Sequence, residues 1–225
     1  MDRSVTRIGA WAGWIGLIGI LGYHLALVAL AGQRVSGTVD EVTIRAYYGQ
    51  SIVAVAGIEQ FLVLVPVAAF AVALRQGLTD SPLRRFLTGV ALVAIVAELP
   101  AIMAEIAAQA GLVAATQAGE PVVGLFRFWD VLYNSGVYVL ESTWVLAFGL
   151  AMRGVPAFPR FMAWLSPLAA LLLAVNVFAI WVGIPDMATL PSAFLLSAWL
   201  GGASLGLWRS GASASVSVME PALTA

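Results

Sequence analysis

The sequence contains no cysteine and no lysine, and its single histidine is His24. Without cysteine the chain has no disulfide, no thiolate zinc site, no iron–sulfur cluster and no covalently attached haem. Without lysine it cannot form a Schiff base with retinal or pyridoxal phosphate, and it has no Walker A motif. One histidine excludes bis-histidine haem and a three-histidine zinc site within one chain. The sequence does not identify a cofactor, but it allows a divalent metal bound mainly by carboxylates.

Charged residues are also scarce, at 10% of the 225 positions. Hydrophobic residues make up 61%, against roughly 45–50% in soluble domains. The net charge is −1, and the sequence contains no basic stripe. Because no cluster of basic residues would displace counterions from phosphates, a nucleic-acid partner is excluded. The apolar runs approach or exceed the ~20 residues that a helix needs to cross a bilayer. The sequence therefore predicts a multi-pass membrane protein in contact with lipid.

The apolar runs predict an all-α bundle of six transmembrane helices in one domain over residues 1–209. The predicted spans cover about 10–31, 50–74, 86–113, 126–152, 161–182 and 187–208. Residues 210–225 are small and polar and are predicted to be a disordered cytoplasmic tail. The glycine-rich first and sixth spans permit close helix contact, so they are candidate surfaces for a homo-oligomer or for another membrane subunit.

The arginines predict the orientation. With six spans, one side of the membrane receives Arg3, Arg7, Arg75, Arg84, Arg85, Arg153, Arg160 and Arg209. The other side receives only Arg34, Arg45 and Arg127. By the positive-inside rule both termini are cytoplasmic, and the predicted location is a bacterial inner membrane.

The fourth span carries a polar stripe. At positions i, i+4, i+8 and i+11 stand Asp130, Asn134, Tyr138 and Glu141, which share one face of a helix. The opposite face is apolar and is predicted to meet lipid through Val131, Leu132, Val139 and Leu146. An ionisable side chain in hydrocarbon costs roughly 2.5–3.5 kcal/mol on insertion scales, so the acids are expected to point into the bundle.

The depth of each polar residue in the membrane follows from its distance to the helix end, at about 1.5 Å per residue. This estimate places the acids of the fourth span at the same levels as polar residues of the other spans. Near the midplane we expect His24, Glu59, Glu98 and Glu141. Nearer the outer face we expect Asp130 and Glu105, with Gln109 and Arg127 beside them. Because Glu98, Glu105 and Gln109 share one face of the third span, two facing stripes would form a funnel open to the outside.

The midplane group supports three interpretations. Carboxylate oxygens and an imidazole nitrogen would suit a divalent metal, with Glu98, Glu141, Glu59 and His24 as ligands. Clustered carboxylates also repel each other when ionised, so one is expected to hold a proton, which suits a proton-coupled pocket. In the third interpretation the same groups only hydrogen-bond one helix to another.

The preferred function is binding or transport of a small solute or cation through this pocket. Glu98 and Glu141 are central, Glu59 and His24 supporting, and Asp130 and Glu105 lie at the outer entrance. One alternative is a non-catalytic subunit whose acids pair with another membrane protein. A metal-dependent intramembrane enzyme is the less favoured alternative, because no Ser/His pair and no His-Glu-x-x-His motif stands in the chain.

The run from Leu150 to Leu165, LAMRGVPAFPRFMAWL, joins a basic helix end, a short turn with proline and an aromatic-then-small helix start. With the six-span layout and the short loops flanked by arginine, it resembles the bacterial integral-membrane family of domain of unknown function 4386. The resemblance extends over most of the chain and implies the six-helix fold. It implies no activity and no site residues.

Overall fold

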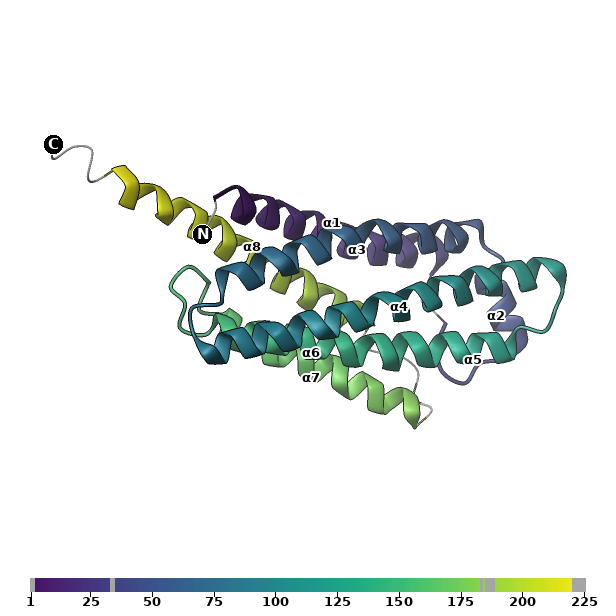
Figure 1. Ribbon diagram of the computed structural model, residues 1–225. Helices are drawn as coiled ribbons and strands as arrows, with labels where there is room; N and C mark the ends of the chain where they lie inside the picture. The colour runs from purple at the N-terminus through teal and green to yellow at the C-terminus, as the bar shows by residue number, and fades with distance from the viewer. Residues whose placement is uncertain (1–2, 33–34, 183, 185–188, 220–225) are drawn as a thin grey trace.

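The structure, a computed structural model, describes residues 3–32, 35–182, 184 and 189–219, and all their side chains except those at 52, 54–62, 189–190 and 212–219. All the secondary-structure elements of the described chain are helices, which confirms the all-α prediction. In chain order the elements are α1 (Arg3–Ala31), α2 (Glu41–Tyr48), α3 (Ser51–Gly77), α4 (Pro82–Ala118), α5 (Val123–Val131), the π-helical turn η1 (Leu132–Val137), α6 (Tyr138–Met152), α7 (Met162–Trp181) and α8 (Thr189–Met219). The long helices lie side by side as a bundle (Figure 1).

Four helices among the described residues are long and apolar enough to cross a bilayer. They are α1, α4, the continuous helix from Val123 to Met152, and α7. Their outer surfaces carry large exposed apolar side chains, as lipid contact requires. On α6, for example, Val139 is 47% exposed. The predicted lipid face of the fourth span is confirmed at Val131, Val139 and Leu146, whereas Leu132 is half-buried. These features indicate a helical membrane protein.

Each predicted span coincides for most of its length with a long helix, but the helix ends differ, and residues 187–188 of the sixth span lie outside the described ones. The third extends from Pro82 to Ala118, because Ser81 caps its first turn and Gly119, at φ +73°, ends it in the left-handed conformation. The sixth continues to Met219. Residues 210–219, predicted as part of a disordered tail, are therefore helical, and residues 220–225 lie outside the described ones.

The bundle has two halves. In one half α1 packs extensively against both α3 and α8, and in the other α6 packs against both α4 and α7. The contacts that join the halves, α3 with α4 and α7 with α8, are sparser. We call this boundary the seam.

Glycines bring α1 close to its neighbours. A Cβ on Gly9 would overlap Ala73, and one on Gly13 would overlap Phe70 and Ser204. In the same way α8 meets the α6–α7 turn at Gly206, where a Cβ would overlap the ring of Phe158. The small-residue faces predicted as oligomer surfaces are thus used largely within the chain.

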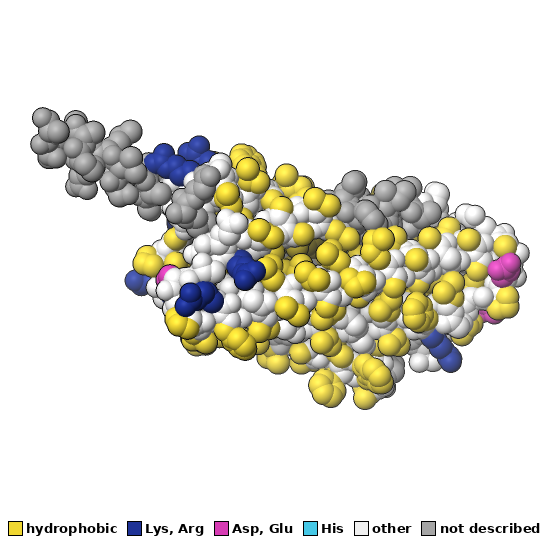
Figure 2. Space-filling view, in the orientation of Figure 1, with side chains coloured by type: hydrophobic (Ala, Val, Ile, Leu, Met, Phe, Trp, Pro, Cys, Tyr) yellow, Lys and Arg dark blue, Asp and Glu magenta, His cyan; other side chains and the backbone are white. Residues whose placement is uncertain are grey.

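Arginines gather at the end of the bundle where α1 begins, as the dark blue side chains in Figure 2 show. They belong to the first turns of α1 and α4 and to the ends of α3 and α6. The described residues thus keep the charge asymmetry expected from the sequence.

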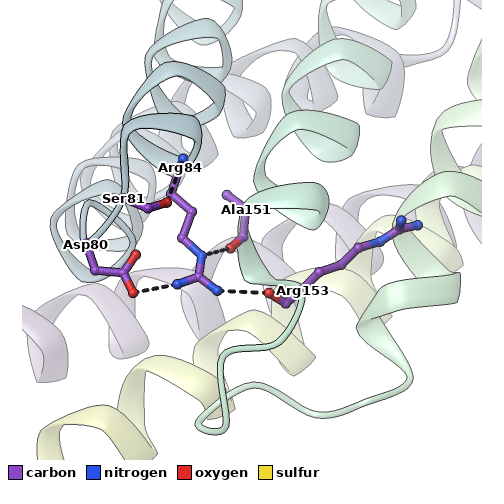
Figure 3. Close-up of polar contacts among 5 residues, drawn as sticks. All are labelled: Asp80, Ser81, Arg84, Ala151 and Arg153. Carbon is purple, nitrogen blue, oxygen red and sulfur yellow. Dashed lines mark hydrogen bonds and ion pairs between the residues drawn. The ribbon is translucent and has the colours of Figure 1, made fainter.

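One of these arginines ties α4 to the end of α6 (Figure 3). Arg84 donates from Nε to the carbonyl of Ala151 (3.0 Å) and from Nη2 to the carbonyl of Arg153 (2.9 Å), so it satisfies carbonyls that the end of α6 leaves without helical donors. Its Nη1 pairs with Asp80, and this hydrogen bond holds the pKa of the Asp80 carboxyl below its usual value. A lowered pKa stabilises the fold above the unfolded-state pKa, so this contribution is lost as the pH falls through the lowered value.

Arg84→Met is expected to destabilise the protein by about 1–3 kcal/mol, because carbonyls at the end of α6 lose their donors. Thermal unfolding in detergent measures the effect. Arg85→Met is the matched control, since Arg85 is exposed and its side chain makes no hydrogen bond to the described residues. Equal losses from the two substitutions would contradict the assigned role of Arg84.

Gly13→Ala is expected to destabilise the same protein by about 1–3 kcal/mol, because the added methyl overlaps α3 and α8. Gly22→Ala, on the same helix, meets no described atom within 4 Å and should be neutral or stabilising by up to about 1 kcal/mol. The same unfolding assay separates the two variants. A tolerated Gly13→Ala would show that α1 does not pack this closely.

Candidate functional site

A cavity of about 120 Å³ lies at the seam. One half of the bundle contributes side chains of α1, α3 and α8, and the other contributes side chains of α4, η1 and α6. Above and below it the apolar core forms two separate clusters, one around Trp199 and Phe148 and the other around Tyr48 and Trp129. The cavity is therefore the polar break between two apolar cores.

Two carboxylates of α4 are held by tryptophans from the neighbouring helix. Trp144 Nε1 donates to Glu98 Oε2 at 2.6 Å, and Trp129 Nε1 donates to Glu105 Oε1 at 2.7 Å. Both acids are buried, Glu98 at 7% exposure and Glu105 at 0%. Because an unsatisfied carboxylate is costly away from water, these indole donors are what allow the acids to remain inside the bundle.

Glu141 is different. It is half-buried on α6, lines the cavity, and accepts no hydrogen bond from any described residue. It also lies close enough to Glu98 for the two carboxylates to interact electrostatically. Beside Glu98, which has an indole donor, the cavity therefore holds an acid that has no donor among the described residues.

His24 and Tyr138 complete the predicted group. Both line the cavity, and His24 Nδ1 lies 2.8 Å from the carbonyl of Ile20, so Nδ1 must carry the hydrogen. Glu105 lines the cavity as well. Glu59 belongs to α3, but its side chain is outside the described set. The structure thus brings together Glu98, Glu141, Glu105, His24 and Tyr138.

Asp130 and Asn134 do not join them, which corrects the single polar stripe and the outer entrance predicted from the sequence. Asp130 accepts hydrogen bonds from Asn134 Nδ2 (2.7 Å) and from the backbone N–H of Gly37 (3.0 Å), so it ties the loop after α1 to α5. The π-helical turn η1, which includes Asn134 and contains one extra residue, lies between Asp130 and Glu141. One residue is about 100° of helix rotation, so Glu141 turns away from the face of Asp130. Glu105 is likewise fully buried against Trp129 and cannot stand at an entrance.

Among the described side chains, the predicted metal ligands Glu98, Glu141 and His24 do not form a metal-binding cluster. No three or more Asp, Glu or His side chains lie together closely enough to hold a metal ion, as far as the side chains are described. Glu59, the fourth predicted ligand, is not among them.

The sequence did not indicate the indole donors. Hydropathy and spacing assign no hydrogen-bond donor to Glu98 or Glu105. Tyr133 stacks on Trp129 at 5.8 Å between ring centroids, and it lies 5.3 Å from Tyr138. One sequence feature does place an indole near the acids: Trp144 stands three residues after Glu141, so the two side chains lie on one side of α6.

The comparisons with known proteins give no relative. No family model, no curated protein and no solved structure matches the chain. The resemblance to the family of domain of unknown function 4386 stays a prediction.

Trp144→Phe is expected to destabilise the protein by about 1–3 kcal/mol, because it leaves Glu98 buried without its donor. Glu98→Leu in the same chain removes the carboxylate, so the double variant should lose less than the sum of the two single variants. Unfolding by SDS in mixed micelles measures the coupling. Trp181→Phe is the control, because Trp181 is 73% exposed and makes no side-chain hydrogen bond to the described residues. Additive losses would show that the pair is not coupled.

Proposed function

We propose that the chain is a six-span protein that binds a small organic cation in the seam cavity and exchanges it for a proton. The observation that carries the proposal is Glu141, a cavity-lining carboxylate with no hydrogen-bond donor among the described residues. A carboxylate that served only to join helices would have such a donor, as Glu98 and Glu105 do. The carboxylate oxygens of Glu141 are instead available to accept hydrogen bonds from a ligand in the cavity.

The lining supports a cationic rather than a neutral or anionic ligand. Among its described lining residues there is no arginine, whereas there are three glutamates. Aromatic rings from Tyr23, Tyr133, Tyr138 and Trp144 stand around them. Rings attract cations through their electron-rich faces, and a partly desolvated carboxylate gains most from a positively charged donor. The volume of about 120 Å³ suits a small amine rather than a larger substrate.

Exchange with a proton follows from the closeness of Glu98 and Glu141. Two neighbouring carboxylates that are sheltered from water repel each other when both are ionised. A proton or a bound cation relieves this repulsion, so the two compete for the same place. Binding of the cation should therefore release a proton from the protein.

The buried acids face the interior of the bundle. This orientation favours a ligand-binding pocket over a subunit that presents its acids to another membrane protein.

The proposed topology has six spans with cytoplasmic termini. The long helices α3 and α8 and the arginines at the end where α1 begins support it.

Wild-type protein in lipid nanodiscs is expected to bind propylammonium and to release a proton on binding. Isothermal titration in two buffers of different ionisation enthalpy measures both quantities. Glu141→Gln should weaken binding by a factor of about thirty or more, because it removes the charge that pairs with the ammonium group. It should also abolish most of the proton release.

Propanol and propionate have a similar size without the positive charge, and neither should bind. Glu120→Gln is the matched control, since Glu120 is an exposed loop acid far along the chain from the cavity. The proposal fails if propylammonium does not bind, if propanol binds equally well, or if Glu141→Gln binds as the wild type does.

A further inference from the structure

A second hollow lies at the turn between α6 and α7, apart from the seam cavity. It has a volume of about 360 Å³ and is lined by residues of the turn and by the first residues of α7. Two of its lining side chains, Arg153 and Arg160, are guanidinium groups, and the rest of the lining is mainly apolar, with Val155, Phe158 and Met162. This combination is absent from the seam cavity, which contains acids and no arginine.

The turn is held firmly in place. Pro156 and Pro159 restrict its backbone, and Gly154 takes the left-handed conformation at φ +73° that lets the chain reverse after α6. The buried ring of Phe158 packs directly on Gly206 of α8. Arg153 also donates from Nη2 to the carbonyl of Ala163 at 3.3 Å. The hollow is thus built by the fold before any ligand arrives.

Neither arginine of the hollow forms a salt bridge with an acid among the described residues. Both salt bridges of the described chain lie elsewhere, between Arg45 and Glu41 and between Arg84 and Asp80. Asp80, the acid found near this end in the described part of the chain, is already paired with Arg84. Figure 3 shows the side chain of Arg153 extending away from that pair. The hollow therefore carries two positive charges, which favour binding of an anion.

Its surroundings place it at the edge of the lipid-facing surface. The outer face of α7 is lined by exposed Leu168, Leu171, Val175 and Phe178. Toward the hollow this apolar stripe ends at Phe161 and Trp164, which are 52% and 80% exposed. Exposed aromatic residues at the end of an apolar stripe are typical of the level of the lipid headgroups.

We propose that this hollow binds the phosphate of an anionic phospholipid headgroup through Arg153 and Arg160. A guanidinium group can donate two parallel hydrogen bonds to phosphate oxygens. The apolar lining residues of the hollow would contact the glycerol and the upper acyl carbons of the lipid. No carboxylate of the described residues stands beside the arginines to receive the amine of a zwitterionic headgroup, so phosphatidylglycerol is favoured over phosphatidylcholine. Basic pockets between transmembrane helices bind anionic headgroups on the same physical grounds.

The test uses the full chain extracted from vesicles of phosphatidylcholine mixed with phosphatidylglycerol. Native mass spectrometry measures which lipid each protein retains. Wild type is expected to retain phosphatidylglycerol selectively. Arg160→Gln should lower its retention about fivefold, and Arg153→Gln with Arg160→Gln by roughly twenty-five-fold, because each arginine near a membrane surface contributes a similar attraction.

Arg160→Gln is the decisive variant, because the Arg160 side chain makes no described contact that folding would need, and its unfolding in phosphatidylcholine should match wild type. Arg127→Gln is the charge-matched control at the other end of the bundle and should retain phosphatidylglycerol as the wild type does. The proposal is overturned if Arg160→Gln keeps full retention, if Arg127→Gln loses as much, or if wild type retains both lipids equally. Binding of inorganic phosphate with the same dependence on Arg160 in phosphatidylcholine nanodiscs would assign the hollow to a soluble anion and also overturn it.

Discussion

Two hydrogen bonds from indole nitrogens to carboxylates organise the interior of this bundle. Lipid offers no donor to a buried acid, so each acid within a membrane-spanning helix needs a partner from its own chain. Trp144 and Trp129 supply that partner for Glu98 and Glu105, and both bonds join α4 to the helix that runs beside it. They fix how these two helices lie against each other, and in doing so they leave Glu141 as the acid that meets the cavity without a donor.

The halves on either side of the seam are held by different means. Glycines let α1, α3 and α8 approach so closely that added methyl groups would overlap. On the other side, hydrogen bonds from indole nitrogens to carboxylates join α4 to α5 and α6. The cavity lies where these two kinds of packing meet, with His24 and Tyr23 of α1 on one side and Glu98 and Glu141 on the other.

Hydropathy and charge identified much of the structure in advance, because helices in lipid must be long and apolar and because arginines collect at one end. The depth argument placed His24, Glu59, Glu98 and Glu141 at one level; His24, Glu98 and Glu141 line the cavity, and the side chain of Glu59 lies outside the described set. Asp130 and Asn134 were misplaced, since an assumed 3.6-residue period carries one face along the whole helix and η1 breaks that period. The tryptophan donors were missed because a neutral indole looks like packing in a sequence. Glycine spacing indicated a close contact but not whether its partner was the same chain or another.

The position of prolines adds a last constraint on the seam. Pro66 lies in α3 between the cavity residues Leu64 and Val67, and Pro100 lies in α4 between Glu98 and Ile102. Each proline lacks the N–H that would bond the preceding turn, so each of the two facing helices lacks a backbone hydrogen bond at the level of the cavity. Bending at these points would change the width of the cavity, while the glycine contacts of α1 and the indole bonds of α4 could stay in place. Pro167 interrupts α7 in the same way, but α7 does not line the cavity. Among the helices around Glu98 and Glu141, α3 and α4 are therefore the ones that lack this backbone restraint at the level of the cavity.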